Sequence, residues 1–426
     1  MKERHMLLAE QTVSVVRELV KRESENPGSD EYKVSCYIKE FCKNLGMEVI
    51  EVPVSERRVN LICRYAGSGK AAPIAFTGHM DVVPVSEAEK NKWKVDPYAA
   101  EILNGRLYGR GAADMKGGLG AVLAALQQLK QVSITPPGDV VLIATVDEEA
   151  VMLGAKKIVE TPYLNGIKNL VICEPSDMLL GCSCRGRTWA DVSVWGQSAH
   201  ASIEGAGNNA IMQAVRLLQA LNPAQKRVPF KPHPHVGNFF WQCTVVQGGI
   251  EPAIIPDKCV VTVDARPVPG QHCSEIWDVF GQLLDELHQA DSSFNATCQV
   301  IESREPWETP EQHPLVRLAG QALTASGAEL KPGGASYTTD GAVFTRLGMD
   351  MIILGPGSIQ ILGVLAQTDA GHAEHAAAVV FPKGRVKFLR PDGSTGAPLQ
   401  GQAILYFGEH VQVFKENFEQ YGRCWQ

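Results

Sequence analysis

The sequence has no long apolar run, no basic cluster and no dense set of cysteines, and each absence excludes a class of protein. No uninterrupted apolar stretch approaches the roughly 20 residues of a membrane-spanning helix, so we expect no membrane association. Lys and Arg number 40 against 47 Asp and Glu, which gives a formal net charge of −7. Nucleic-acid binding depends on a basic patch and is therefore not expected.

The cysteines and the first residues both favour a cytoplasmic protein. The 11 cysteines are scattered and odd in number, unlike the dense disulfide framework of small secreted domains, so we expect buried or free thiols. A metal or redox role for Cys182 and Cys184 is the weaker alternative, because their spacing is too short for the usual zinc pair. The first residues also lack the apolar block of a signal peptide.

Hydrophobic periodicity predicts an α/β fold for the two ends of the 426-residue chain. Two almost continuous apolar runs, 140–146 and 169–173, are typical of strands buried on both faces of a parallel sheet. Other short strands are expected at 48–54, 59–64, 73–77 and 350–354, and helices at 7–21, 31–45, 119–129 and 315–326. We therefore expect a central, mostly parallel sheet flanked by helices.

The pattern changes after Arg187, where apolar and polar residues begin to alternate as in a half-buried strand. Strands are expected at 189–195, 239–246, 259–265 and 296–301, and helices at 208–221 and 274–290. This β-α-β-β-α-β order predicts an inserted ferredoxin-like α+β domain. Residues 302–314, which contain three prolines, are expected to form the return linker. The predicted domains are thus 1–186 with 313–426, which is discontinuous, and 187–312.

Acidic residues and a histidine gather where the predicted strands of the first domain end. His79 and Asp81 follow one strand, Glu148 and Glu149 follow another, and Glu174 follows a third. Asp114 lies in a Gly-rich loop that leads into a helix. In open α/β sheets ligands bind beyond the carboxyl ends of the strands, and clustered carboxylates repel one another unless a cation neutralises them.

This residue set favours a metal site. Imidazole and carboxylate ligands suit Zn²⁺, with Co²⁺ or Mn²⁺ as alternatives. His79 and Asp81 are two residues apart and face the same way in extended backbone, so Asp81 can accept the other ring N–H of His79. Of the adjacent Glu148 and Glu149, one can bind metal while the other serves as a general base.

Each piece also has a simpler interpretation. A histidine before an aspartate is usually part of a turn, and acidic residues after a strand often begin a solvated helix. The Gly-rich loop could cradle a phosphate, but it lacks the Gly-Lys-Ser/Thr ending of a P-loop. The ordered combination of three strand ends and the Gly-rich loop favours the metal hypothesis over coincidence.

With these motifs the chain resembles the acetylornithine deacetylase / succinyl-diaminopimelate desuccinylase / carboxypeptidase G2 family of di-zinc metallohydrolases. The similarity extends to about Ser358. The motifs that carry it are Gly78-His79-x-Asp81-Val82-Val83-Pro84, Trp93-x3-Pro97, Leu107 to Gly118, Asp147-Glu148-Glu149, Cys173-Glu174-Pro175-Ser176, Ser198-Ala199-His200, Asp264 to Gly270, Thr339-Asp340 and Gly355-Pro356-Gly357-Ser358.

The resemblance implies a zinc exopeptidase-like fold with two metals per subunit and a role for each residue of the cluster. His79 and Glu174 would hold one metal, Glu149 would hold the other, and Asp114 would bridge both. Asp81 would orient His79, and Glu148 would be the general base.

The resemblance also implies roles for the inserted domain, which would act as a lid and as the interface of a homodimer. His200 would reach across the dimer to polarise the scissile carbonyl, and Arg266 would bind the substrate carboxylate. The simpler alternatives are a surface turn histidine and a strand-end arginine. In the other domain, Thr339, Asp340 and Gly355 are expected to contact substrate.

The chain departs from the family pattern at two places. Ala253 stands where the family usually has an asparagine, which puts substrate contacts on the inserted domain in doubt. The family also supplies its last metal ligand from a histidine soon after the Gly355–Ser358 turn, and here no histidine follows at that spacing. The tail offers His372, which we favour, His375 as the alternative, and the more distant His410.

The predicted function is metal-dependent hydrolysis of the amide bond of N-acyl amino acids, of the acetylornithine deacetylase or succinyl-diaminopimelate desuccinylase type. A dipeptidase or carboxypeptidase of the same family would use the same site, with a dipeptide as substrate. A non-catalytic scaffold is a third hypothesis, which the altered tail motivates.

Overall fold

The computed structural model of the chain describes residues 2–27, 30–103, 106–325, 331–357 and 378–380. The chain divides into two compact units. The described residues of the first unit fall within 1–182, 309–333 and 339–426. The second unit consists of residues 183–308 and 334–338.

The first unit is built on a sheet with the strand order β1-β2-β6-β3-β7-β17-β8. The central strands β6, β3, β7 and β17 run parallel, and β1, β2 and β8 pair antiparallel with their neighbours. The expected central, mostly parallel sheet is therefore confirmed. The strands are β1 (Glu48–Pro53), β2 (Val59–Tyr65), β3 (Ile74–His79), β6 (Val140–Thr145), β7 (Asn169–Ile172), β8 (Leu180–Cys184) and β17 (Asp350–Ile353).

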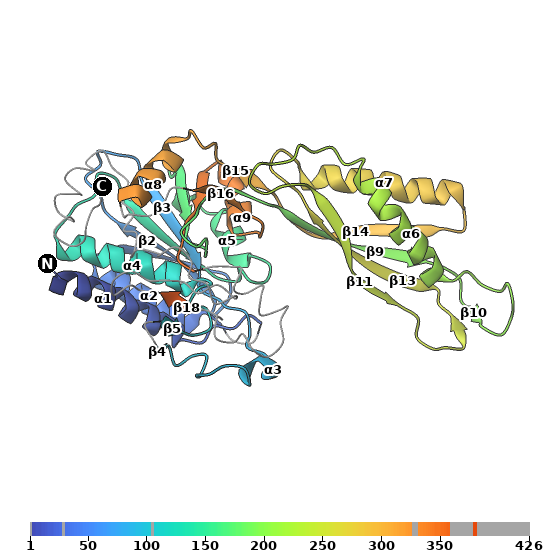
Figure 1. The fold of residues 1–426 in the computed structure, drawn as a ribbon, viewed down its shortest axis with the longest axis horizontal. Helices are drawn as coiled ribbons and strands as arrows, with labels where there is room; N and C mark the ends of the chain where they lie inside the picture. The colour runs from blue at the N-terminus through green and yellow to red at the C-terminus, as the bar shows by residue number, and fades with distance from the viewer. Residues whose placement is uncertain (1, 28–29, 104–105, 326–330, 358–377, 381–426) are drawn as a thin grey trace, which may run out of the picture. The chain divides into compact units, whose positions relative to one another are not determined.

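Helices pack on this sheet, and the contacts form two adjoining apolar clusters. Helices α1, α2 and α4 pack on β2 and β6, and α8 packs on β3, β7 and β17. Val122 and Val140 lie at the margin of both clusters, so the helices form one continuous layer, in which α1 and α4 lie side by side (Figure 1). The helices of this unit are α1 (Lys2–Val20), α2 (Tyr32–Asn44), α3 (Glu87–Lys90), α4 (Lys116–Gln131), α5 (Leu153–Ile158), α8 (Pro314–Ala325) and α9 (Gly341–Phe344), with short 3₁₀ turns at Pro162–Leu164 and Thr345–Leu347.

A separate three-stranded sheet, in the order β18-β5-β4, also belongs to the first unit. Its strands are β4 (Glu101–Leu103), β5 (Arg106–Tyr108) and β18 (Ala378–Val380), and β5 pairs antiparallel with both neighbours.

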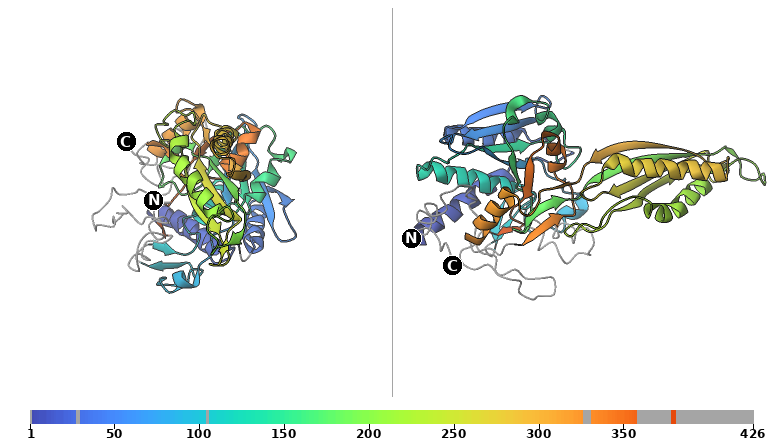
Figure 2. Two further views of the ribbon diagram at one scale, coloured as in Figure 1. Left: turned by 90° about the vertical axis from the view of Figure 1, so that its right-hand side faces the viewer. Right: turned by 90° about the horizontal axis from the view of Figure 1, so that it is seen from above.

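The second unit has the predicted ferredoxin-like order. Its antiparallel sheet runs β11-β13-β9-β14, and α6 and α7 cover one face of it (Figure 2). The edge-to-face pairs of Trp241 with Phe239 and with Phe280 lie in the core between sheet and helices. The elements are β9 (Arg187–Trp195), β10 (Ala199–His200), α6 (Ala210–Gln225), β11 (Phe240–Gly248), β12 (Ile254–Ile255), β13 (Lys258–Arg266), α7 (Cys273–Ala290), β14 (Asn295–Arg304), β15 (Trp307–Glu308) and β16 (Pro332–Ala335), whose first two residues belong to the first unit.

The structure corrects one sequence expectation, that residues 302–314 form a linker. Strand β14 continues to Arg304, because a bulge between Val300 and Glu302 restores its pairing with β9. The Thr188 hydroxyl also donates to the Glu302 carbonyl at 2.8 Å. Residues 307–308 then form β15, so regular structure occupies part of the predicted linker.

The described residues bear on two sequence expectations, membrane association and the state of the cysteines. No helix among them is long and apolar enough to span a membrane. The ten cysteines among them are free thiols.

Candidate metal centre

The predicted site residues of the first unit come from neighbouring strands. His79 ends β3, which pairs in parallel with β6 so that His79 lies opposite Thr145. Glu148 and Glu149 follow β6, and Glu174 follows β7 on the other side of β3. Because parallel strands end at the same edge of a sheet, these side chains converge there.

His79 lies at the centre of the cluster. Its Nε2 atom is 3.1 Å from Asp114 Oδ1 and 3.5 Å from Glu174 Oε1. Around His79, two overlapping groups bring their ligand atoms within 4.8 Å of one another: His79 with Asp114 and Glu149, and His79 with Glu148 and Glu174. The structure thus brings together five of the predicted site residues.

Without a cation, the buried carboxylates of the cluster are disfavoured in their ionised form. Burial, reinforced by the charge of Asp114, raises the pKa of Glu149 to about 8 and raises the pKa of Glu174 well above its usual range. Burial opposes protonation of His79, but the Glu174, Asp114 and Asp81 carboxylates raise the pKa of its imidazole well above the usual value. A divalent cation would offset both the burial and the repulsion of these carboxylates, since it favours their ionised form.

The tautomer of His79 also fits a metal ligand. Its Nδ1 atom is 2.9 Å from the main-chain oxygen of Asp81. A carbonyl oxygen only accepts, so Nδ1 carries the proton and the Nε2 lone pair of the neutral ring faces Asp114 and Glu174. This donor set of one imidazole nitrogen and carboxylate oxygens fits zinc, cobalt or manganese.

The Asp81 carboxylate lies beside His79, the residue that it is expected to orient, and also holds the loop after β6. The shorter contact of His79 Nδ1 is with the Asp81 main chain, and the carboxylate Oδ1 lies 3.5 Å away. The two carboxylate oxygens also accept from the backbone N–H groups of Glu148 and Glu149, each at 3.1 Å. Asp81 therefore contacts both the histidine and the paired glutamates.

Two glycines let the chain pack tightly around Glu174. A Cβ atom on Gly118, near the start of α4, would lie 2.1 Å from the carbonyl oxygen of Cys173. A Cβ on Gly355 would lie 2.4 Å from the same oxygen and 2.5 Å from the Glu174 carbonyl oxygen. The backbone on both sides of Glu174 is thus fixed at distances that only glycine permits.

We expect Gly118→Ala to displace Glu174 and to lower both metal content and the thermal midpoint. Alanine in a helix normally stabilises by about 1 kcal/mol relative to glycine. A loss of stability in this variant would therefore indicate the clash of the new Cβ with the Cys173 carbonyl. Gly281→Ala in α7 is the matched control, because its Cβ would meet nothing within 4 Å. Thermal unfolding and metal analysis of both variants check this, and equal behaviour would contradict it.

The other predicted residues of the first unit surround the carboxyl end of the sheet. Thr339 and Asp340 are buried, and the Thr145 hydroxyl donates to Asp340 Oδ2 at 2.7 Å. The Gly355 N–H donates to the Ser176 hydroxyl at 3.1 Å. These contacts connect the end of β6 and the loop after β7 to the C-terminal part of the unit.

His200 and Arg266 lie in the second unit. His200 is exposed on β10, with its Nδ1 atom 2.7 Å from the Ser202 hydroxyl oxygen. Arg266 ends β13, and its Nε lies 2.9 Å from an Asp264 carboxylate oxygen. His372, His375 and His410 lie outside the described residues.

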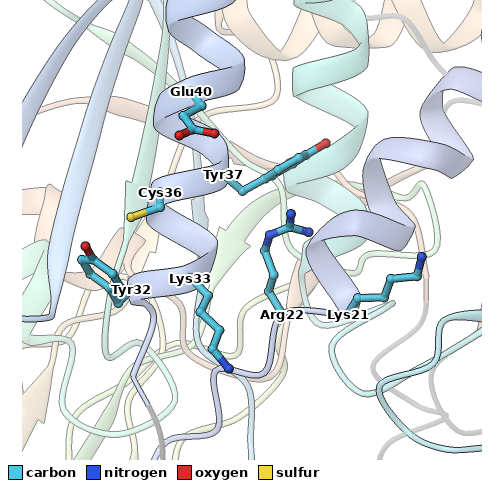
Figure 3. A pocket seen from close by; sticks show the side chains of 7 residues that line it. All are labelled: Lys21, Arg22, Tyr32, Lys33, Cys36, Tyr37 and Glu40. Atoms are coloured by element: carbon cyan, nitrogen blue, oxygen red, sulfur yellow. The ribbon is translucent and has the colours of Figure 1, made fainter.

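A groove of about 450 Å³ lies between α1 and α2 and is lined by none of the predicted site residues (Figure 3). Arg22 stacks on the Tyr37 ring there, with 4.3 Å between the guanidinium carbon and the ring centroid. Its lining is Lys21, Arg22, Tyr32, Lys33, Cys36, Tyr37 and Glu40. It offers a single carboxylate, so we do not assign it to the metal chemistry.

Three residues outside the predicted site, Asn26, Arg58 and Glu31, hydrogen-bond to Asp147 at the start of the loop after β6. An asparagine before a proline is a common turn signal, and charged residues in loops are common, so nothing in the sequence distinguished them.

The chain is similar to known proteins over most of its length. Residues 75–385, more than half of the chain, match the profile of peptidase family M20/M25/M40. An acetylornithine deacetylase from Myxococcus xanthus is 30% identical over 312 residues, which cover 71% of this chain and 77% of that protein. A probable succinyl-diaminopimelate desuccinylase from Staphylococcus epidermidis is 26% identical over 380 residues, which cover 82% and 91%.

The fold is shared with solved structures. The crystal structure of a dinuclear metal-binding peptidase of the M20 family from Bacillus subtilis superposes with a TM-score of 0.64 at 15% identity, covering 88% of this chain and 93% of that one. Fold and cluster together define an α/β metallohydrolase with an inserted α+β unit. The chain belongs to peptidase family M20/M25/M40 and is a metal-dependent hydrolase. The expected family is thereby confirmed.

Proposed function

We propose that the protein hydrolyses the amide bond of N-acyl amino acids and releases a carboxylate and a free amino acid. The observation that carries this proposal is the convergence of Glu148 with the His79, Asp114, Glu149 and Glu174 ligand atoms. The names of the relatives, acetylornithine deacetylase and succinyl-diaminopimelate desuccinylase, support this substrate class over others. The free cysteines support a cytoplasmic location, since reducing compartments keep thiols free.

The proposed cofactor is a pair of zinc ions, with cobalt or manganese as alternatives. His79 and Glu174 would hold one ion, Glu149 the other, and Asp114 would bridge them. The last ligand would be His372 from the tail, with His375 as the alternative. When bound, the metals would lower the pKa of a water molecule and stabilise negative charge on the amide oxygen.

Glu148 is the proposed general base. Its side chain is buried, with 6% of the residue exposed, and its backbone N–H is held by Asp81 at 3.1 Å. From this fixed backbone the carboxylate can accept a proton from the attacking water and deliver it to the departing amine. The same carboxylate of Asp81 also accepts from the Glu149 N–H, at 3.1 Å.

We propose that the second unit supplies substrate contacts and the interface of a homodimer. His200 would polarise the scissile carbonyl from the partner subunit, and Arg266 would bind the substrate carboxylate in a bidentate pair. Thr339, Asp340 and Gly355 would line the substrate site of the first unit. The antiparallel sheet of the second unit offers edge strands for two-fold pairing.

A substrate panel with metal analysis tests this function. N-acetyl and N-succinyl amino acids are expected to be hydrolysed faster than dipeptides, with two metals per chain. His200→Ala should depress kcat with the metals retained, and His372→Ala should lower the metal content from two toward one. Faster cleavage of dipeptides would favour the alternative, an exopeptidase, which is motivated because the Bacillus subtilis protein of the same fold is a peptidase. Two bound metals with no turnover of any substrate would contradict the proposal.

A further inference from the structure

The connection between α1 and α2 is fastened to the segment that carries Asp81. The Ser24 hydroxyl donates to the Met80 carbonyl at 2.7 Å, and the Val82 N–H donates to the Ser24 carbonyl at 3.0 Å. The Asn26 N–H in turn donates to the Val82 carbonyl at 2.9 Å. These bonds place the Asn26 side chain beside Asp81.

The Asn26 amide joins two buried carboxylates. Its Nδ2 atom is 2.9 Å from Asp81 Oδ2 and 2.9 Å from Asp147 Oδ1. Asp81 is 0% exposed and Asp147 is 2% exposed. An amide nitrogen has two hydrogens, so it can satisfy one oxygen of each carboxylate. Two buried like charges would otherwise repel each other at this position.

Each of these carboxylates holds one side of the loop that carries the paired glutamates. Asp81 accepts from the N–H groups of Glu148 and Glu149, as described above. Asp147 Oδ2 accepts from the N–H groups of Val151 at 3.3 Å and Leu153 at 3.2 Å. Asp147 itself has a φ of +69°, a conformation that aspartate rarely adopts without such support.

Arg58 and Glu31 complete the network on its outer side. Arg58 Nη1 donates to Asp147 Oδ1 at 2.8 Å, and its Nε donates to Glu31 Oε2 at 2.8 Å. Glu31 also accepts from the Asp147 N–H at 3.1 Å. Asn26, Glu31 and Arg58 all lie before residue 75, outside the part of the chain that matches the family profile.

We propose that Asn26 is a positioning residue that sets Glu148 and Glu149 through Asp81 and Asp147, with Arg58 holding Asp147 from the other side. Its amide bonds to Asp81 and Asp147, neither of which is a proposed metal ligand. Its amide bonds to both carboxylates and so fixes their separation and orientation. These two carboxylates in turn bind the backbone of the loop that carries Glu148 and Glu149. The proposal rests on the proposed roles of Glu148 as base and Glu149 as ligand.

Asn26→Asp tests the proposal, because it keeps the shape of the side chain and replaces the donor with an oxygen. Loss of support around a metal site costs about 10–100-fold in activity or metal affinity. We expect kcat to fall in that range while KM changes less than about threefold. We also expect a shift in the visible absorption bands of the cobalt-substituted protein, which a general loss of stability would not produce.

Asn91→Asp is the matched control, since Asn91 is exposed and its amide makes only a 3.4 Å contact with the Glu87 carbonyl. It should leave kcat and the cobalt spectrum unchanged. An Asn26→Asp protein with wild-type kcat and a wild-type cobalt spectrum would overturn the proposal.

Arg58→Lys provides a second test of the proposal if the Asn26→Asp protein fails to fold. It keeps the charge but cannot reach Glu31 and Asp147 together as the guanidinium does. We expect a smaller fall in kcat and a smaller spectral shift, and no change in either would overturn the proposal. A wild-type protein that binds cobalt but hydrolyses no substrate would instead contradict the proposed function, and the cobalt spectra would still decide the role of Asn26.

Discussion

Glu148→Gln is expected to lower kcat by at least about 10²–10⁴-fold, the range of a lost general base, while both metals stay bound. The substitution keeps the size and the polarity of the buried side chain and removes only its ability to accept a proton. KM should change little, because substrate contacts are proposed to come from other residues. Steady-state kinetics together with metal analysis of the purified variant measure both quantities.

Glu149→Gln separates the two neighbouring glutamates. It should lower the metal content, because Glu149 lies with His79 and Asp114 in one of the two ligand groups. Glu160→Gln is the surface control, since Glu160 is exposed and pairs only with Lys157 at 3.1 Å. Loss of metal with appreciable turnover in Glu148→Gln would show that the roles of Glu148 and Glu149 are exchanged.

The architecture of the first unit could be predicted because its strands carry an unambiguous pattern. The apolar runs at 140–146 and 169–173 became the parallel strands β6 and β7 on either side of β3. Acidic residues placed directly after such strands had to meet at one edge of the sheet. That geometry is a consequence of parallel pairing, so the cluster around His79 followed from the order of the motifs.

Other features had no signal in the sequence. Strand β8, Leu180–Cys184, is buried but consists largely of glycine, cysteine and serine, residues without a strong strand preference. The carboxylate of Asp81 bonds to the Glu148 and Glu149 backbone because β3 and β6 are neighbours, a relation that residue spacing does not contain. The Asn26 contacts depend in the same way on the path of the connection between α1 and α2.

Removal of the metals is expected to abolish activity and to destabilise the protein more at about pH 8 than at about pH 6. Burial raises the pKa of Glu149 to about 8, and burial likewise raises the pKa of Glu174. Neighbouring carboxylates raise the pKa of His79 despite its burial. In the unfolded chain these groups have pKa values of about 4.3 for Glu and 6.5 for His.

All three shifts act on stability in the same direction. The metal-free folded protein holds protons that the unfolded chain releases, so its stability falls as the pH rises from about 4.3 through the raised values. Bound divalent cations would reverse this effect, because they favour the ionised carboxylates and the neutral imidazole. The decrease in the thermal midpoint on chelation should therefore be larger at the higher pH, as measured by thermal unfolding with and without chelator.

The same comparison in Glu149→Gln should show a smaller pH dependence, since one of the carboxyl groups with a raised pKa is gone. A loss on chelation that is equal at both pH values in the wild-type protein would show that these groups hold no extra protons in the metal-free folded protein.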